Sequence, residues 1–224
     1  MYKTETHMHT APVSSCGRLS PREMVLRYRD AGYSTVFISD HFAEYHFDRL
    51  GDNLTWEQKI DLFFNAYAEA KAVGDECGVC VLFSAELSLA GNHYLLYGMK
   101  KDMMLSVPDI FTWTIQAFSA YARRNGITVV QAHPLRDGKC TPQPEFVDGL
   151  EAINSNPRHE NFDERVFEIA RQYGLPVSAG SDAHREEDIA GSAILSRKKI
   201  RTVEEYVELL KSGEARLMKW GRML

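Results

Sequence analysis

Short apolar runs alternate along the chain with longer segments of helical period. Lys3 to Met8 has the alternation of a strand, and the β-branched run at 34–40 is typical of a buried strand. Capping boxes at Ser20 and Thr55 predict helices that end near Gly32 and Cys77. Further strands are expected at 79–87, 93–98, 127–133, 149–155, 175–184 and 192–196, and further helices at 110–124, 162–173 and 202–210. This alternation predicts an α/β fold with a mainly parallel sheet closed into a barrel.

Composition fits one globular domain spanning 1–224, with 44% hydrophobic and 25% charged residues in a chain of 224. The net charge of −5 excludes a broad basic face, so nucleic acid is not the expected partner. No apolar run approaches the roughly 20 residues of a membrane span, and no secretory leader is visible. Four cysteines do not make a disulfide framework, so a reducing cytoplasm is the expected compartment. The oligomeric state stays open.

The apolar runs end in residues of metal-ligand types. Five of the eight histidines lie at such ends, together with carboxylates: His7, His9, His41, Glu86, His133, Asp182 and His184. Parallel strands bring their C-terminal ends to one face, where barrel enzymes build their sites. His93 begins its strand instead, but it follows Glu86 closely enough for a tight turn to return it to the same rim.

Imidazole and carboxylate together suit divalent ions such as Zn²⁺, Mn²⁺ or Fe²⁺. The candidates exceed the four ligands of a structural zinc site, which argues for two or three metal ions. His7 and His9 share one face of a strand, so both can bind one ion. Ions about 3.5–4 Å apart can clamp the attacking and leaving oxygens of a hydrolysis.

The motifs THMHT, ISDHF, AEL, QAHP and GSDAH resemble, in this order, those of the PHP (polymerase and histidinol phosphatase) superfamily. The resemblance covers the chain from Thr6 to His184. It implies a distorted (β/α)7 barrel with a di- or trinuclear metal site that hydrolyses phosphoesters. By motif, one metal would be held by His7, His9, Glu86 and Asp182, a second by Glu86, His93 and His133, and a third by His41 and His184.

The loop after the first strand departs from the family pattern. It reads Ser15-Cys16-Gly17, with Cys16 where the family commonly has an acidic residue or histidine. A thiolate is a good ligand for zinc and a poor one for magnesium. Cys16 is therefore either a ligand of the third metal or a small residue packed in a loop.

Several other polar residues follow strand ends. Asp40 would orient a ligand or accept hydrogen bonds from backbone donors. Arg136, Arg18 and Arg158 are candidates to grip a phosphate, with a solvated surface position as the alternative. Asn154 lies beyond another strand end.

The remaining candidates favour structural roles. Cys77 and Cys80 are interpreted as core packing, because no second pair accompanies them. His46 and His159 lie in polar segments and are expected to be exposed. The basic run at 197–201 is expected to be a solvated face.

The leading hypothesis is a metal-dependent phosphoesterase that hydrolyses a small phosphorylated substrate through a metal-bridging hydroxide. Glu86, Asp182 and His184 are its predicted catalytic residues, and the proton donor to the leaving group would be Asp182 or an unligated histidine. One alternative is a nuclease-like PHP domain that acts on nucleic-acid ends. Another is a metal-binding domain with weakened catalysis, suggested by Cys16.

Overall fold

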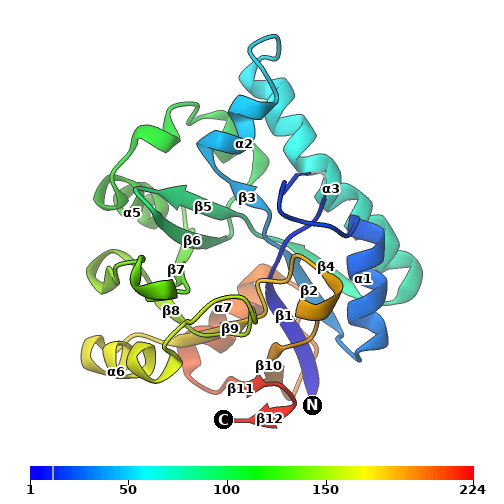
Figure 1. Ribbon diagram of the computed structural model, residues 1–224, viewed down its shortest axis with the longest axis vertical. Coiled ribbons are helices and arrows are strands. Elements are labelled where there is room, and N and C mark those ends of the chain that lie inside the picture. Colours follow the sequence, from blue (N-terminus) through cyan, green and yellow to red (C-terminus); the bar gives the residue numbers. More distant parts are fainter. Residues whose placement is uncertain (12) are drawn as a thin grey trace.

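The computed structural model describes residues 1–11 and 13–224 and has an α/β fold built on two mixed sheets (Figure 1). In the first sheet, of order β12-β11-β10-β1-β2-β4, β1 is parallel to β2 and antiparallel to β10, and β2 is parallel to β4. Its strands are β1 (Tyr2–Met8), β2 (Thr35–Ile38), β4 (Cys80–Phe83), β10 (Ser192–Ser196), β11 (Arg216–Lys219) and β12 (Arg222–Met223).

The second sheet has the order β3-β5-β6-β7-β8-β9. Its strands are β3 (His41–Phe42), β5 (Glu86–Leu89), β6 (Asn92–Tyr97), β7 (Thr128–Ala132), β8 (Gly149–Asn154) and β9 (Val177–Gly180). β6 runs antiparallel to β5 and β7 because a two-residue turn at Ala90 and Gly91, both with positive φ, reverses the chain. This is the tight turn that the position of His93 required.

The two sheets meet where β1 passes the end of β9. Met8 and Ala183 form an isolated parallel bridge, and the N–H of His9 donates to the carbonyl oxygen of Ala183 at 2.9 Å. The expected closed (β/α)7 barrel is not established by these strand ladders. The antiparallel strands β6 and β10 interrupt the strand–helix repeat, because β6 follows β5 through a turn instead of a crossover helix.

Helices accompany the sheets as the alternation predicted. The longer ones are α1 (Pro21–Asp30), α3 (Trp56–Cys77), α5 (Ile115–Arg124), α6 (Asp163–Tyr173) and α7 (Val203–Ser212). Shorter segments are α2 (Glu44–Arg49), α4 (Lys101–Leu105) and the 3₁₀ turns Ile110–Thr112, Arg136–Gly138, Pro144–Phe146 and Glu186–Asp188. Both predicted capping boxes are confirmed, with the hydroxyls of Ser20 and Thr55 accepting from the backbone N–H three residues on.

The prediction of a single helix at 110–124 is wrong. The segment divides into a 3₁₀ turn and α5, because Trp113 is extended and the hydroxyl of Thr114 caps α5 by accepting from the N–H of Ala117. The short helices α2 and α4 and the hairpin of β11 and β12 were not predicted, because these segments lack a long periodic pattern.

An aromatic cluster holds α2 against α3. Phe47 packs on Trp56 at 5.0 Å between ring centroids, and His46 meets Phe47 edge-on at 5.2 Å. His46 is 7% exposed, so the expectation of an exposed side chain is wrong. Burial lowers the pKa of His46 to about 4. His159 is exposed as expected, and its Nδ1 lies 2.9 Å from the Asp137 carboxylate.

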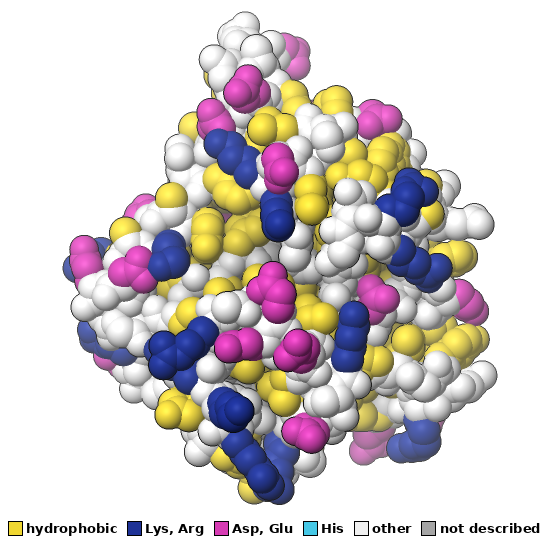
Figure 2. Space-filling view, turned by 180° about the vertical axis from the view of Figure 1, so that it is seen from behind, with side chains coloured by type: hydrophobic (Ala, Val, Ile, Leu, Met, Phe, Trp, Pro, Cys, Tyr) yellow, Lys and Arg dark blue, Asp and Glu magenta, His cyan; other side chains and the backbone are white. Residues whose placement is uncertain are grey.

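Charged side chains of both signs are scattered over the face turned away from the view of Figure 1. Figure 2 shows acidic side chains lying among the lysines and arginines there. Within the part of the chain that the structure describes, no helix combines the length and apolarity needed to cross a membrane.

Candidate metal centre

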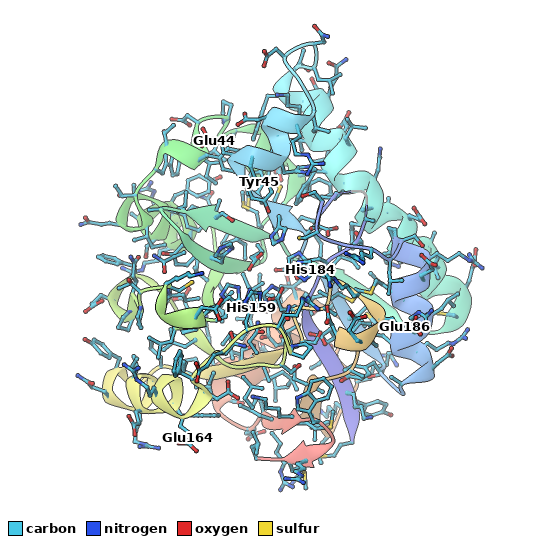
Figure 3. The ribbon with its side chains drawn as sticks, in the orientation of Figure 1. Glu44, Tyr45, His159, Glu164, His184 and Glu186 are labelled. Carbon is cyan, nitrogen blue, oxygen red and sulfur yellow. The ribbon has the colours of Figure 1, made fainter. Side chains whose placement is uncertain are left out.

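The predicted ligand residues gather where the strand ends meet. The bridge between Met8 and Ala183 is parallel, so their neighbours on each side come together in space. His7 and His9 thereby face Asp182 and His184. Figure 3 shows His184 near the centre of the view, whereas Glu164 of α6 lies toward the lower edge.

The first group of ligand atoms surrounds the facing rings of His7 and His9. Their Nε2 atoms are 3.1 Å apart. Asp182 Oδ1 lies 3.4 Å from His7 Nε2 and 3.0 Å from His9 Nε2, and Glu86 Oε1 lies 3.4 Å from His7 Nε2. Two lone pairs facing each other repel unless a proton or cation lies between them. These four side chains therefore form an arrangement that one divalent ion would satisfy.

Glu86 reaches a second group through the same oxygen. His133 Nε2 lies 3.1 Å and His93 Nδ1 lies 3.4 Å from Glu86 Oε1. Sheet register explains this meeting, because His41 is paired with Glu86, and His93 with Ala132. Glu86 thus occupies the position between two groups that a bridging carboxylate would need.

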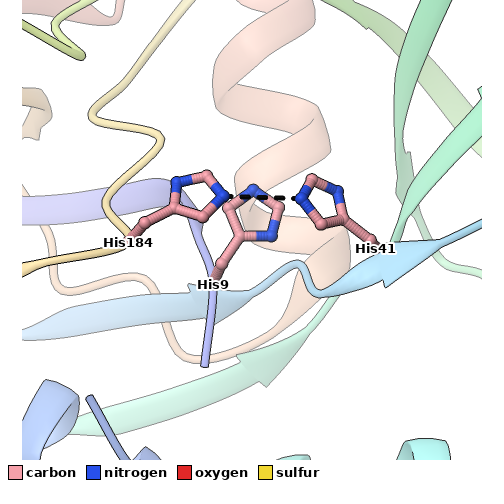
Figure 4. A group of neighbouring side chains, drawn as sticks. All are labelled: His9, His41 and His184. Carbon is pink, nitrogen blue, oxygen red and sulfur yellow. Dashed lines mark hydrogen bonds between the residues drawn. The ribbon is translucent and has the colours of Figure 1, made fainter. Parts of the chain in front are cut away.

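The third group consists of His9, His41 and His184 (Figure 4). The Nε2 atoms of His41 and His184 are 3.4 Å apart. The centroid of the His9 ring lies 4.1 Å from that of His41 and 4.2 Å from that of His184. Nδ1 of His184 lies 2.8 Å from the carbonyl oxygen of Asp182, which directs its Nε2 toward the group.

Cys16 lies beside this third group. Its Sγ is 3.2 Å from Nε2 of His41, and the residue is exposed to solvent. Partial burial raises the pKa of the thiol, but hydrogen bonds with His184 and His41 outweigh it and lower the pKa to about 6. The structure therefore brings Cys16 to the predicted position, with a thiol disposed to ionise.

The donor set fits divalent metal ions. Within residues 1–11 and 13–224, the buried Nδ1 of His133 has no hydrogen-bond partner. Other buried ligand atoms face one another, with His41 Nδ1 2.5 Å from Glu86 Oε2 and Asp182 Oδ1 3.0 Å from His9 Nε2. Burial would raise the pKa of Glu86 and of Asp182, yet the surrounding charges hold both pKa values well below their usual range. The largest opposing charge is that of His93 for Glu86 and that of Arg136 for Asp182. Buried carboxylates kept ionised among imidazoles are what a cation site requires.

Asp40 holds the loop that follows β1. Its carboxylate accepts from the N–H and the hydroxyl of Thr10, both at 2.6 Å, and from the hydroxyl of Ser14 at 2.8 Å. Ser14 Oγ lies 3.2 Å from His9 Nδ1. The carboxylate of Asp40 therefore satisfies a backbone donor and is linked to His9 through Ser14.

The three candidate phosphate-binding arginines have different surroundings. Arg136 forms an ion pair with Asp182, and its Nη2 donates to Asn154 Oδ1 at 3.1 Å. Arg158 is held by both oxygens of Asp188, at 2.5 and 2.8 Å. Arg18 has an exposed side chain, and its N–H donates to the carbonyl oxygen of His184. Of the three, Arg136 is the one whose guanidinium contacts the cluster.

Two buried acids that contact the cluster, Glu5 and Glu151, were not predicted from the sequence. Oε1 of Glu5 accepts from the N–H groups of Thr6, His7 and Ser181 at 2.9 to 3.0 Å. Burial raises the pKa of Glu5 to about 7. Glu151 contacts the ring of His7 at 2.9 Å. The one feature of the sequence that could have identified them is that each is an acidic residue within an otherwise apolar predicted strand.

The fold and the cluster define an α/β protein with a buried centre of imidazoles and carboxylates. The PHP-associated family matches residues 161–215, which include Asp182 and His184. PsfC from Pseudomonas syringae has a similar structure, with a TM-score of 0.67, 15% identity and coverage of 92% of this chain and 87% of that one.

Two further solved structures share the fold. A two-domain protein from Bacteroides vulgatus containing a predicted PHP-like metal-dependent phosphoesterase gives a TM-score of 0.65 at 16% identity, covering 99% of this chain and 66% of that one. The lesion-specific endonuclease EndoQ from Pyrococcus furiosus gives 0.62 at 15% identity, covering 94% and 56%. No curated protein sequence matches. The match over residues 161–215 and the shared fold agree with the resemblance to the PHP superfamily that the motifs indicated.

Proposed function

We propose that this chain, as one PHP-like domain over 1–224, is a phosphoesterase that uses two or three divalent ions to hydrolyse a small phosphorylated substrate. The observation that carries the proposal is the position of Glu86 between two histidine groups, with His133 and His7 at 3.1 and 3.4 Å from one oxygen. The proposed ligands are His7, His9, Cys16, His41, Glu86, His93, His133, Asp182 and His184.

The ions would supply a nucleophilic water at neutral pH and neutralise charge on the phosphoryl oxygens. The chain's own residues would hold the rings of the ligand histidines in place. Burial, followed by the charges of His41 and His184, keeps the pKa of His9 well below its usual value, so this ring offers a lone pair and not a proton. Imidazole and carboxylate donors favour Zn²⁺, Mn²⁺ or Fe²⁺, and a thiolate from Cys16 would favour zinc or iron at the third group.

Arg136 is the proposed phosphate-binding residue. It is largely buried, pairs with Asp182 and would present guanidinium N–H groups to a phosphate lying over the ions. Asp182 and His184 are, with Glu86, the proposed catalytic residues. Because the pKa of Asp182 is held well below its usual range, an unligated histidine is the proposed source of the proton for the leaving group.

A nuclease acting on nucleic-acid ends is the second candidate, because EndoQ shares the fold. The net charge of −5 favours a small substrate instead.

The test is metal analysis of the purified protein followed by assays with phosphomonoesters and with single-stranded DNA ends, each with added manganese, zinc or iron. His133→Asn should lose hydrolysis and bound metal, whereas the matched control His159→Asn, at an exposed histidine outside the cluster, should keep both. Hydrolysis of DNA ends alone would favour the nuclease. Bound metal without hydrolysis of any ester would contradict both candidates and favour the catalytically weakened domain.

A further inference from the structure

Glu151 lies in the middle of β8, is 1% exposed, and uses both carboxylate oxygens. Oε1 lies 2.9 Å from His7 Nδ1. Oε2 accepts from the backbone N–H of His133 at 3.0 Å and from Nδ2 of Asn154 at 2.8 Å. One side chain thus contacts residues of the first and the second ligand groups.

We propose that Glu151 is a positioning residue that holds the His7 ring with its proton on Nδ1, so that Nε2 presents a lone pair to the cluster. The proposal rests on the cluster being a metal centre, as the proposed function requires. Glu151 is not itself one of the proposed ligands; it would act on the metal only by orienting the ring of His7.

The direction of the hydrogen bonds is fixed by donors that cannot reverse. The backbone N–H of Asn156 and the guanidinium of Arg136 both donate to Oδ1 of Asn154, at 3.2 and 3.1 Å. The amide of Asn154 must therefore turn Nδ2 toward Glu151. Because Oε2 of Glu151 already accepts from Nδ2 and from a backbone N–H, a carboxyl proton has no acceptor on that side.

On the other side, the proton belongs to the imidazole. Nδ1 of His7 and Oε1 of Glu151 lie 2.9 Å apart with one proton between them, and an imidazole is a stronger base than a carboxylate. Nδ1 of His7 therefore donates to Glu151, and Nε2 points at Asp182 Oδ1, 3.4 Å away. Asp182 pairs in turn with Arg136, so the contacts form a closed ring through His7, Glu151, Asn154, Arg136 and Asp182.

The backbone at Gly180 leaves room for the contact between Glu151 and His7. A Cβ atom added at Gly180 would lie 2.4 Å from Glu151 Oε1 and 2.4 Å from His7 Cβ. Only glycine leaves room at that position for the carboxylate to approach the ring. The requirement for glycine follows from the contact between β8 and β1 across the end of β9.

The experiment compares zinc binding and histidine NMR in the full-length protein and in Glu151→Gln. The amide that replaces the carboxylate has one acceptor oxygen, yet N–H donors face it on both sides, so one donor always meets an NH₂ group. The zinc-loaded wild type should show a slowly exchanging Nδ1–H resonance for His7. Glu151→Gln should lose that resonance or its protection and bind zinc about 10–100-fold more weakly.

Glu5→Gln is the matched control, because Glu5 is also a buried acid that contacts His7, but through the backbone N–H and not the ring. It should keep the resonance and bind zinc within about threefold of wild type, well inside the range expected for losing a ring-orienting carboxylate. If Glu151→Gln does not fold, Asn154→Ala breaks the same ring at the next link and should weaken zinc binding several-fold.

Retention of the resonance and of zinc affinity in Glu151→Gln, or an equal loss in Glu5→Gln, would overturn the inference, as would unchanged affinity in Asn154→Ala. Failure of the proposed function gives a different result. Zinc binding with the expected variant effects, but without phosphoester hydrolysis, would overturn the function and leave the role of Glu151 standing. A wild type that binds no zinc would overturn both.

Discussion

Cys16 offers a direct test of how the third ligand group is built, because its thiol can be titrated in the metal-free protein. The contacts with His184 and His41 lower its pKa from 9.0 to about 6. At neutral pH this changes the ratio of thiolate to thiol from about 1:100 to about 10:1. The side chain is exposed, so a small alkylating reagent can reach it.

The assay is alkylation by iodoacetamide across a range of pH, with each cysteine quantified by mass spectrometry. The intrinsic reactivity of a thiolate falls with its pKa, by a factor of about 20–30 over three units, so the midpoint of the pH profile is the informative quantity and not the absolute rate. Cys16 should show a midpoint near pH 6. Cys80 and Cys140 are internal controls, because burial raises the pKa of both thiols and their reaction should require alkaline pH.

His41→Gln should move the midpoint of Cys16 upward, because the histidine at 3.2 Å is one cause of the shift. A midpoint near the ordinary value of 9.0 in the wild type would refute the reasoning. Added zinc should protect Cys16 if the thiolate is a ligand. In the same case, Cys16→Ala should lose third-site metal only, and Cys16→Asp should keep activity and shift preference from zinc toward manganese.

Three further predictions concern other parts of the site. Glu86→Gln should abolish hydrolysis and remove at least one metal ion per chain by elemental analysis, with the circular dichroism spectrum preserved, because a neutral amide cannot hold two cations together; full metal content with normal turnover would contradict this. Arg136→Lys should lower kcat/KM about tenfold, roughly 1.4 kcal/mol, without loss of metal, whereas Arg18→Lys should have no effect; equal effects of the two changes would remove Arg136 from phosphate binding. Glu5 has a pKa of about 7 in the folded protein against 4.5 in an unfolded chain, so the folded state holds the proton more tightly and stability is lost as pH rises between these values. Relative to Glu5→Gln, the wild type should therefore lose about 3 kcal/mol over that interval in urea unfolding, and parallel pH profiles would show that Glu5 does not titrate there.

The positions of the candidate ligands could be predicted because they depend on short-range rules. His7 and His9 share a strand face by their spacing alone, and parallel strands bring their C-terminal ends together without knowledge of partners. The capping boxes at Ser20 and Thr55 are equally local. These features need only a few neighbouring residues, so the pattern of the chain contains them.

The roles of Glu151 and Arg158 depend on contacts that no local pattern specifies. Arg158 was a candidate for phosphate, but it is paired with Asp188, whose Oδ2 also accepts from the N–H of His184. Glu151 becomes a partner of His7 across 144 residues of sequence. His46 is buried because α2 packs on α3, and the polar residues around it in sequence indicate the opposite.

The backbone conformation of two candidate ligands also could not be predicted from local sequence. His133 and Asp182 have φ values of 30° and 51°, in the left-handed region that side chains other than glycine rarely occupy. Each costs on the order of 1–3 kcal/mol and persists only where surrounding contacts impose it. Here the N–H of His133 donates to Glu151 at 3.0 Å, and the N–H of Asp182 donates to the carbonyl oxygen of His7 at 2.8 Å. Both contacts tie a strained ligand to the pair of β1 and β8 residues that orients the first group. The strained conformations are thus stabilised by contacts that form only when distant segments of the chain come together. The periodicity of the sequence therefore could not predict them.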